Sequence, residues 1–284
     1  MANRWNWLLA PPVVVSLLLL GVTQFVFLEK SFFLDLGLGL SGDELTLQNY
    51  VDVLTDPLYF DSMKLTVVLA FSVVLLSLLL TYPVAYLLTR MPPRLATFLL
   101  AAIVCSTFVS VSIKILGMVI IFAADGAVSG FFRWLGVIDQ SLQIIGTIPG
   151  VIFGYIHLAI GFMVMMLFNV IQTIPVRLEE AAQIHGASRW RVYWRVVVPL
   201  SLPGVLNASL IEFNLLMGAF VTAIILGGGK VLTFPVLIQR TLTLFNDYGM
   251  AAAMSAVLLV IVLVINVVSV VCVSRLKLNL GTVA

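Results

Sequence analysis

A few ionisable side chains stand inside otherwise apolar runs of this chain, and they are the first candidates for chemistry. Glu212 lies in the middle of one such run, with Asn214 two residues later, and Lys114 lies near the end of another. An ionisable group in a hydrophobic segment is costly and usually faces a polar interior or the path of a solute. Glu212, Asn214 and Lys114 are therefore candidates for lining a pathway, and a carboxylate there would suit a cationic or amine-bearing solute.

The same side chains also have structural interpretations, which the sequence leaves open. Glu212 could be protonated or hydrogen-bonded and hold its helix to a neighbouring helix. The long side chain of Lys114 could extend to the membrane surface. These alternatives require no contact with a solute.

The sequence contains no pattern typical of a catalytic or metal-binding site. The run from Gly227 to Lys230 is not a phosphate-binding loop, because Val231 stands where Ser or Thr is needed and the first glycine of the pattern is absent. Cys105 and Cys272 lie far apart without metal-ligand spacing. The basic residues are spread over short loops, which does not favour binding to nucleic acid. We expect no enzyme activity, no metal and no cofactor in this chain.

The densest group of charges lies in the stretch EEAAQIHGASRWRVYWRVVVPLSLPG, residues 179–204. A short helix through Glu179 and Glu180 should end at Gly186, because glycine best tolerates the left-handed conformation that follows a helix. Ser188 can cap a second helix. The stretch therefore predicts two short helices joined by a tight turn.

The second of these helices should have an aromatic face. Trp190, Tyr193 and Trp194 recur at helical spacing, so they lie on one side, which is typical of a helix at a membrane interface. We expect Pro199 to end this helix and Pro203 to begin the next membrane span.

The first of the two helices has the features of a docking surface for another protein. Glu179 and Glu180 offer negative charge to a basic partner, and the small residues Ala181, Ala182 and Gly186 allow another surface to come close. The alternative is a solvated loop that only follows the charge bias of membrane proteins.

These segments belong to a chain whose composition is that of a membrane protein. Hydrophobic residues make up 62% of it, charged residues only 10%, and the mean hydropathy is +1.16. A soluble domain carries roughly 25% charged residues, so this chain cannot cover itself with a polar surface. Six continuous apolar stretches have the length that a spanning helix needs. They are approximately 7–28, 63–88, 95–121, 149–171, 203–226 and 250–273.

The charges of the connecting segments predict the orientation. One side, with both termini and the segments 90–94 and 172–202, carries nine basic and two acidic residues. The other side carries five basic and ten acidic residues. Because Lys and Arg favour the cytoplasmic side, we expect both termini and the stretch 179–204 to be cytoplasmic in a multi-pass protein of the bacterial inner membrane.

The charged stretch resembles the EAA loop of ABC importer permeases. That pattern is E-A-A, three residues, G, nine residues, I-x-L-P, and this chain has Glu180-Ala181-Ala182, then Gly186, then VVVP at 196–199. The resemblance covers about residues 60–275. The later run GAFVTAIILGGGKVLTFPVLIQ is similar to the spermidine/putrescine-type branch of these permeases.

The resemblance implies a fold, a mechanism and partners. The fold would be the all-α MetI-like permease fold, with six transmembrane helices and a cytoplasmic coupling helix. The partners would be two cytoplasmic ATPase subunits that bind the ATP, a second and different permease subunit, and a periplasmic or lipid-anchored substrate-binding protein. The substrate would be a polyamine or another small amine-bearing solute. Coupling to the ATPase would involve Glu179, Glu180, Ala181, Ala182, Gly186 and Ala187.

We expect one membrane domain with two appendages. Residues 1–60 should hold the first helix and a periplasmic loop, residues 61–275 the permease core, and residues 276–284 a cytoplasmic tail. Two other classes stay open. A self-sufficient secondary transporter or channel would not need a docking helix, and an intramembrane enzyme would need a paired catalytic group that the sequence lacks.

Overall fold

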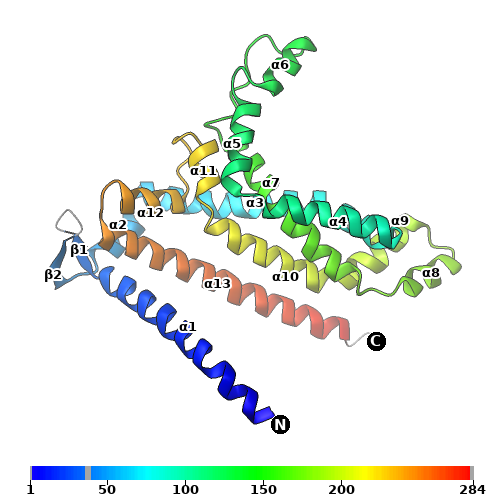
Figure 1. Ribbon diagram of the computed structural model, residues 1–284, viewed down its shortest axis with the longest axis horizontal. Helices are drawn as coiled ribbons and strands as arrows, with labels where there is room; N and C mark the ends of the chain where they lie inside the picture. The colour runs from blue at the N-terminus through cyan, green and yellow to red at the C-terminus, as the bar shows by residue number, and fades with distance from the viewer. Residues whose placement is uncertain (1, 36–39, 282–284) are drawn as a thin grey trace. The chain divides into compact units, whose positions relative to one another are not determined.

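The computed structural model describes residues 2–35 and 40–281 and is almost entirely helical (Figure 1). The chain divides into two compact units. The first comprises residues 1–63 and 237–261, and the second comprises residues 64–236 and 262–284. The long helices α3 (Pro57–Arg90) and α13 (Tyr248–Gly281) each contribute to both units.

The first unit is organised around the N-terminal helix and a small hairpin. Its elements are α1 (Ala2–Lys30), β1 (Phe33–Asp35), β2 (Ser41–Leu45), α2 (Gln48–Thr55) and most of α12 (Phe234–Thr243). The two strands pair antiparallel. Asn49 is buried and donates to the carbonyl oxygens of Ser31 at 3.1 Å and Phe33 at 2.9 Å, which fixes α2 against the chain that leaves α1. The predicted first helix is confirmed.

The second unit holds the helices that carry the candidate sites. They are α4 (Pro93–Phe108), α5 (Val111–Phe122), α6 (Ala127–Trp134), α7 (Ile148–Ile171), α8 (Val176–Ile184), α9 (Arg189–Val192), α10 (Val198–Met217) and α11 (Val221–Leu226). A π-helical segment, η1 (Tyr193–Val197), joins α9 to α10. Helix α10 packs along α7, and many of the fully buried apolar side chains of the unit come from these two helices and α3.

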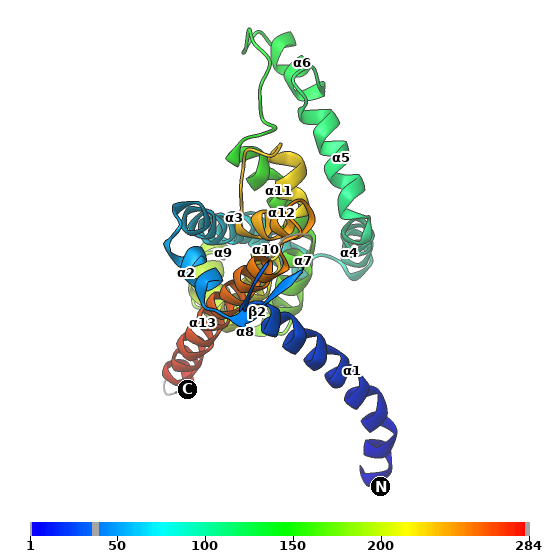
Figure 2. The same ribbon diagram turned by 90° about the vertical axis from the view of Figure 1, so that its left-hand side faces the viewer.

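Six segments of the described chain are long and apolar enough to cross a membrane. The number agrees with the sequence prediction, but the third segment is 111–134 rather than 95–121. The predicted third helix is broken, because Val109 and Ser110 are extended, and α5 leaves the end of α4 in a new direction (Figure 2). The Lys114 ammonium donates to the carbonyl oxygens of Ser106 at 3.2 Å and Thr107 at 3.4 Å, which supplies partners for the end of α4.

The fifth predicted span is also shifted. A helix expected to end at Pro199 and restart at Pro203 runs without a break from Arg189 to Met217, and Leu226 lies in the separate helix α11. A proline inside a helix lacks an N–H and clashes with the carbonyl four residues earlier. The π-helical turn just before Pro199 widens the backbone there, and Val198 donates to the Tyr193 carbonyl, so the helix accommodates Pro199 instead of ending.

Helix α13 continues through residues 276–281 of the predicted cytoplasmic tail, and residues 282–284 lie outside the described chain. The side of the membrane that each segment faces stays a prediction.

Gly154 allows α7 to approach α11 closely. A Cβ atom at this position would lie 2.5 Å from Thr222 Cγ2 and would also overlap Leu226 Cδ1. Gly117 in α5 is a matched control, since a Cβ atom there would meet no atom within 4 Å.

We expect Gly154→Ala to lower the free energy of unfolding by about 1–3 kcal/mol through overpacking. Gly117→Ala should be neutral or stabilising by about 0.5–1 kcal/mol, because alanine is the better helix former. Thermal unfolding of the two purified variants in detergent measures both effects. Equal unfolding temperatures would show that α7 and α11 do not touch at Gly154.

Candidate functional site

Helix α8 is the predicted coupling helix, and the sequence explains both of its ends. It begins after Pro175 and ends at Ile184, and Gly186, two residues later, has φ +83°, a left-handed conformation. Ala187 N–H donates to the Ala182 carbonyl at 3.1 Å and Gly186 N–H to the Gln183 carbonyl at 2.9 Å, which is the hydrogen-bond pattern of a Schellman end. The predicted role of Gly186 in ending the helix is confirmed.

The following turn is closed by Ser188, as the sequence predicts. Its hydroxyl accepts a hydrogen bond from the Arg191 N–H at 3.4 Å, at the start of α9. A tight turn therefore joins the short helix α8 to the start of the long helix that runs from Arg189 to Met217.

Glu179 is buried inside the second unit, which corrects the expectation that it offers charge to a partner. Its carboxylate accepts hydrogen bonds from Tyr86 Oη at 2.8 Å and from Arg90 Nε at 2.9 Å, and it also pairs with Arg90 Nη2. Tyr86 and Arg90 lie at the end of α3. A helix turns about 100° per residue, so burying Glu179 directs its neighbour Glu180 elsewhere.

The exposed side of α8 carries the remaining coupling candidates. Glu180, Ala181 and Gly186 are exposed, and Ala182 and Ala187 are half-buried. Ile184 adds an apolar side chain that is 85% exposed. An exposed carboxylate and an exposed isoleucine among small residues form a surface that a complementary protein groove can cover.

The aromatic residues of α9 and η1 pack together, as their spacing predicts. Trp190 stacks on Tyr193 with ring centroids 5.7 Å apart, and Trp194 packs edge-on against both rings. Tyr193 also meets Tyr82 and Tyr86 of α3. The aromatic face is thus divided between the contact with α3 and an open groove.

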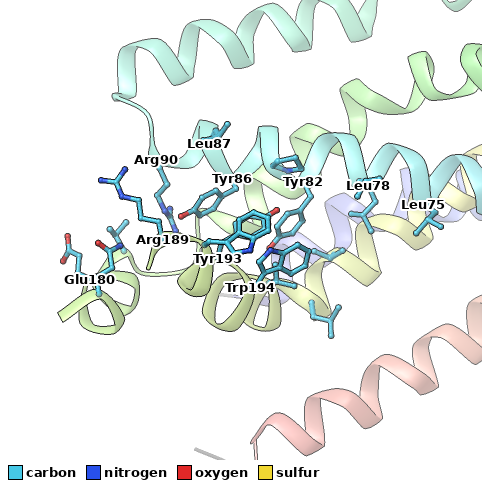
Figure 3. A pocket seen from close by; sticks show the side chains of 18 residues that line it. Leu75, Leu78, Tyr82, Tyr86, Leu87, Arg90, Glu180, Arg189, Tyr193 and Trp194 are labelled. Carbon is cyan, nitrogen blue, oxygen red and sulfur yellow. The ribbon is translucent and has the colours of Figure 1, made fainter. Parts of the chain in front are cut away.

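This groove lies between α3 on one wall and the segment from α8 to the start of α10 on the other (Figure 3). Its volume is ≈ 930 Å³. Leu75 and Leu78 lie toward one end, and Arg90, Arg189 and Glu180 lie at the other.

Glu212 is buried in α10, far along the helix from the coupling segment. It is 1% exposed, and its Oε2 atom has no hydrogen-bond partner in the described chain. The same is true of Ser209 Oγ, three residues earlier on the same face of α10. A solute or a water molecule could bind these two atoms. The role of Glu212 in lining a pathway stays a prediction.

The structure gives Asn214 and Lys114 structural partners. Asn214 and Asn266 of α13 exchange two amide hydrogen bonds, at 2.9 Å and 3.0 Å. Lys114 binds the α4 carbonyl oxygens described above, rather than Glu212. The three pathway candidates therefore do not form one cluster, although no observation tests their contact with a solute.

The sequence reasoning missed the α3 residues that hold α8 in place. Tyr82, Tyr86 and Arg90 are spaced by four, so they form one stripe of the helix. Tyr82 Oη lies 2.7 Å from Ser201 Oγ of α10, and Tyr86 and Arg90 bind Glu179. The signal in the sequence was a stripe of polar residues at the end of an apolar span. The sequence analysis used only the charge of Arg90, to predict the orientation, and not the spacing of the three residues.

Comparison with known proteins agrees with this architecture. The family described as "Binding-protein-dependent transport system inner membrane component" matches residues 82–278. The chain belongs to this family. It is therefore a multi-pass permease subunit of an ABC importer in the inner membrane, and the predicted family, fold class and general function are confirmed. Family membership decides against a self-sufficient secondary transporter or channel.

Individual relatives extend the similarity to nearly the whole permease. The chain is 30% identical over 256 residues to the spermidine/putrescine transport system permease protein PotB of Escherichia coli, covering 90% of each chain. It is 28% identical over 212 residues to a probable sulfate transport system permease protein, cysT, of Chlorella vulgaris, covering 74% of this permease and 77% of that one. The fold matches a bacterial ABC transporter that imports alginate, with a TM-score of 0.81, 19% identity and 96% of each chain covered.

The pair between Arg90 and Glu179 can be tested by a double-mutant cycle. We expect Glu179→Gln and Arg90→Gln each to lower the unfolding temperature of the purified permease, because each leaves a charge without its partner. The free energy of unfolding of the double variant should fall by less than the sum of the two single losses. The difference is a coupling energy of about 0.5–3 kcal/mol. Glu180→Gln is the control and should leave the unfolding temperature unchanged, since Glu180 is exposed. Additive losses would contradict the pairing.

Proposed function

We propose that this permease is one of two different membrane subunits of an importer for polyamines or closely related small amines. The observation that carries the proposal is the similarity to PotB, which extends over nearly the whole of both chains. The similarity to a probable sulfate permease is lower and covers less of the chain, which favours the amine class.

Coupling to ATP hydrolysis would take place at the exposed side of α8. A cytoplasmic ATPase subunit would seat Glu180 and Ile184 in a groove, with the small residues Ala181 and Gly186 allowing close approach. Two such ATPase subunits would bind the ATP, one under each permease. The continuous helix from Arg189 to Met217 would carry movement of this surface into the membrane. Both termini would then be cytoplasmic, as the charge distribution predicts.

The solute would pass Glu212. A carboxylate with an unpartnered oxygen beside the unpartnered Ser209 hydroxyl suits an ammonium group, which donates up to three hydrogen bonds. A binding protein outside the membrane would deliver the solute, as the family description implies.

Reversing the charge of Glu180 tests the coupling surface. In membranes carrying the whole transporter, Glu180→Lys should abolish uptake and prevent the ATPase subunit from co-purifying with the tagged permease. The fold should be unchanged, because Glu180 is exposed. Pull-down followed by mass spectrometry measures the association, and uptake of labelled spermidine measures transport.

Glu180→Asp is the matched control, because it keeps the charge and should retain most of the association. A Glu180→Lys permease that still binds the ATPase and transports at the normal rate would refute a docking role. Wild-type permease that brings down neither an ATPase nor a second six-span protein would refute the proposed assembly.

Neutralising Glu212 tests the pathway. We expect Glu212→Gln to reduce uptake of putrescine and spermidine by about tenfold, the loss of one charge-assisted hydrogen bond to an amine. Asn214→Ala is the control: it removes a contact with Asn266 and should lower the unfolding temperature without changing selectivity. Unchanged uptake of a panel of amines by Glu212→Gln would leave Glu212 with a structural role only.

A further inference from the structure

The groove between α3 and the α8–η1 segment has no role in the function described so far. Its lining comes from α3 between Leu75 and Arg90, and from α8, α9, η1 and the first part of α10. Only one of its residues, Glu180, belongs to the proposed contact with the ATPase. The groove has a volume of ≈ 930 Å³, and its lining indicates what kind of molecule could bind in it.

The lining changes in character along the groove. One end is walled by Leu75, Leu78 and Leu79 of α3 and by Leu202 and Val205 of α10. The middle is aromatic, and the opposite end presents charged and amide side chains (Figure 3). An occupant that satisfies all of it must be polar at one end and apolar along the rest.

The length of the groove matches one leaflet of a bilayer. Leu75 and Arg90 are separated by about 22 Å along α3, at about 1.5 Å rise per residue. Half of a bilayer that is about 40–45 Å thick, including the headgroup regions, measures about 20–22 Å. Trp190 and Trp194 line the groove and are exposed, and such residues gather where the hydrocarbon meets the headgroups.

The charges at the polar end select the headgroup. Arg90 is neutralised by Glu179, so it offers no free charge. Arg189 also lines this end, and within the described residues it makes no ion pair. Glu180 is the other charged group there and points from α8. A guanidinium without a partner at the level of the headgroups is suited to a phosphate, which it can bind through two parallel hydrogen bonds.

We propose that the groove binds one glycerophospholipid from the leaflet on the α8 side of the membrane. Arg189 binds the phosphate, the aromatic residues contact the glycerol region, and the acyl chains lie along the leucines of α3. Because one wall is α3 and the other carries the coupling helix, the lipid bridges the two elements that the Arg90–Glu179 pair also joins. The assignment does not depend on which solute the importer carries.

A photoactivatable phosphatidylglycerol with a diazirine in one acyl chain tests the site. The probe is added to the whole transporter in detergent with excess lipid, irradiated, and the mass of the intact permease is measured. We expect one added lipid, with the cross-link mapping to 75–79 or 202–205. Arg189→Ala should reduce labelling there by about tenfold, and Arg189→Lys should restore most of it.

Arg191→Ala is the matched control, because Arg191 is exposed two residues away and does not line the groove. It should label like the wild type. Leu79→Trp provides a second test that leaves Arg189 intact: Leu79 is 71% exposed, so the larger ring is tolerated and should block the acyl chain. Size-exclusion profiles of the complex verify that each variant is assembled.

Three results would overturn the proposal. Equal labelling of the Arg189→Ala and Arg191→Ala permeases would exclude a phosphate contact at Arg189. Equal labelling by a diacylglycerol glycolipid probe that has no phosphate would do the same. If p-benzoylphenylalanine in place of Leu79 cross-links to protein rather than lipid in native membranes, the groove is a contact between protein segments instead.

Discussion

The ion pair between the partly buried Arg90 and the buried Glu179 fixes the position of α8. It joins the end of α3 to α8, and the same guanidinium reaches the Ile174 carbonyl in the turn before α8 at 3.5 Å. Removing two charges from water is costly, and the pair therefore adds little net stability. Any arrangement that separates the charges is much worse. The main effect of the ion pair is therefore to select one orientation of α8 against α3, because other orientations separate the two charges.

Helix α10 extends this constraint into the membrane. Because η1 accommodates Pro199, the backbone is helical from Arg189 to Met217 without a break. Glu212 lies 23 residues along this helix from Arg189, which corresponds to about 34 Å at about 1.5 Å per residue. A continuous helix transmits a displacement along its axis without a relay of side-chain contacts. A movement imposed on α8 and α9 therefore reaches the neighbourhood of the buried carboxylate directly.

Features that depend on local chemistry could be predicted from the sequence. Gly186 and Ser188 end and begin helices for reasons that involve only their neighbours, and both predictions are confirmed. Apolar length predicted the number of spans. The break at Val109 and the continuity through Pro199 could not be predicted, because each depends on how backbone groups find partners. Lys114 supplies them at the break, and a π-helical turn makes room for the proline. The apolar composition of a segment is the same whether its helix is broken or continuous, so composition alone could not distinguish the two.

The contrast between Glu179 and Glu180 shows where a motif stops being informative. The two carboxylates are adjacent and chemically alike, and the sequence assigned both to the same partner surface. Tyr86 and Arg90 of α3 distinguish them: if Glu179 faced outward, the partly buried Arg90 guanidinium would lose its counter-ion and Tyr86 its hydrogen-bond acceptor. The stripe on α3 therefore determines which carboxylate stays exposed on α8. A residue 89 positions away in sequence decides which carboxylate of the motif is buried, and spacing within the motif cannot reveal it.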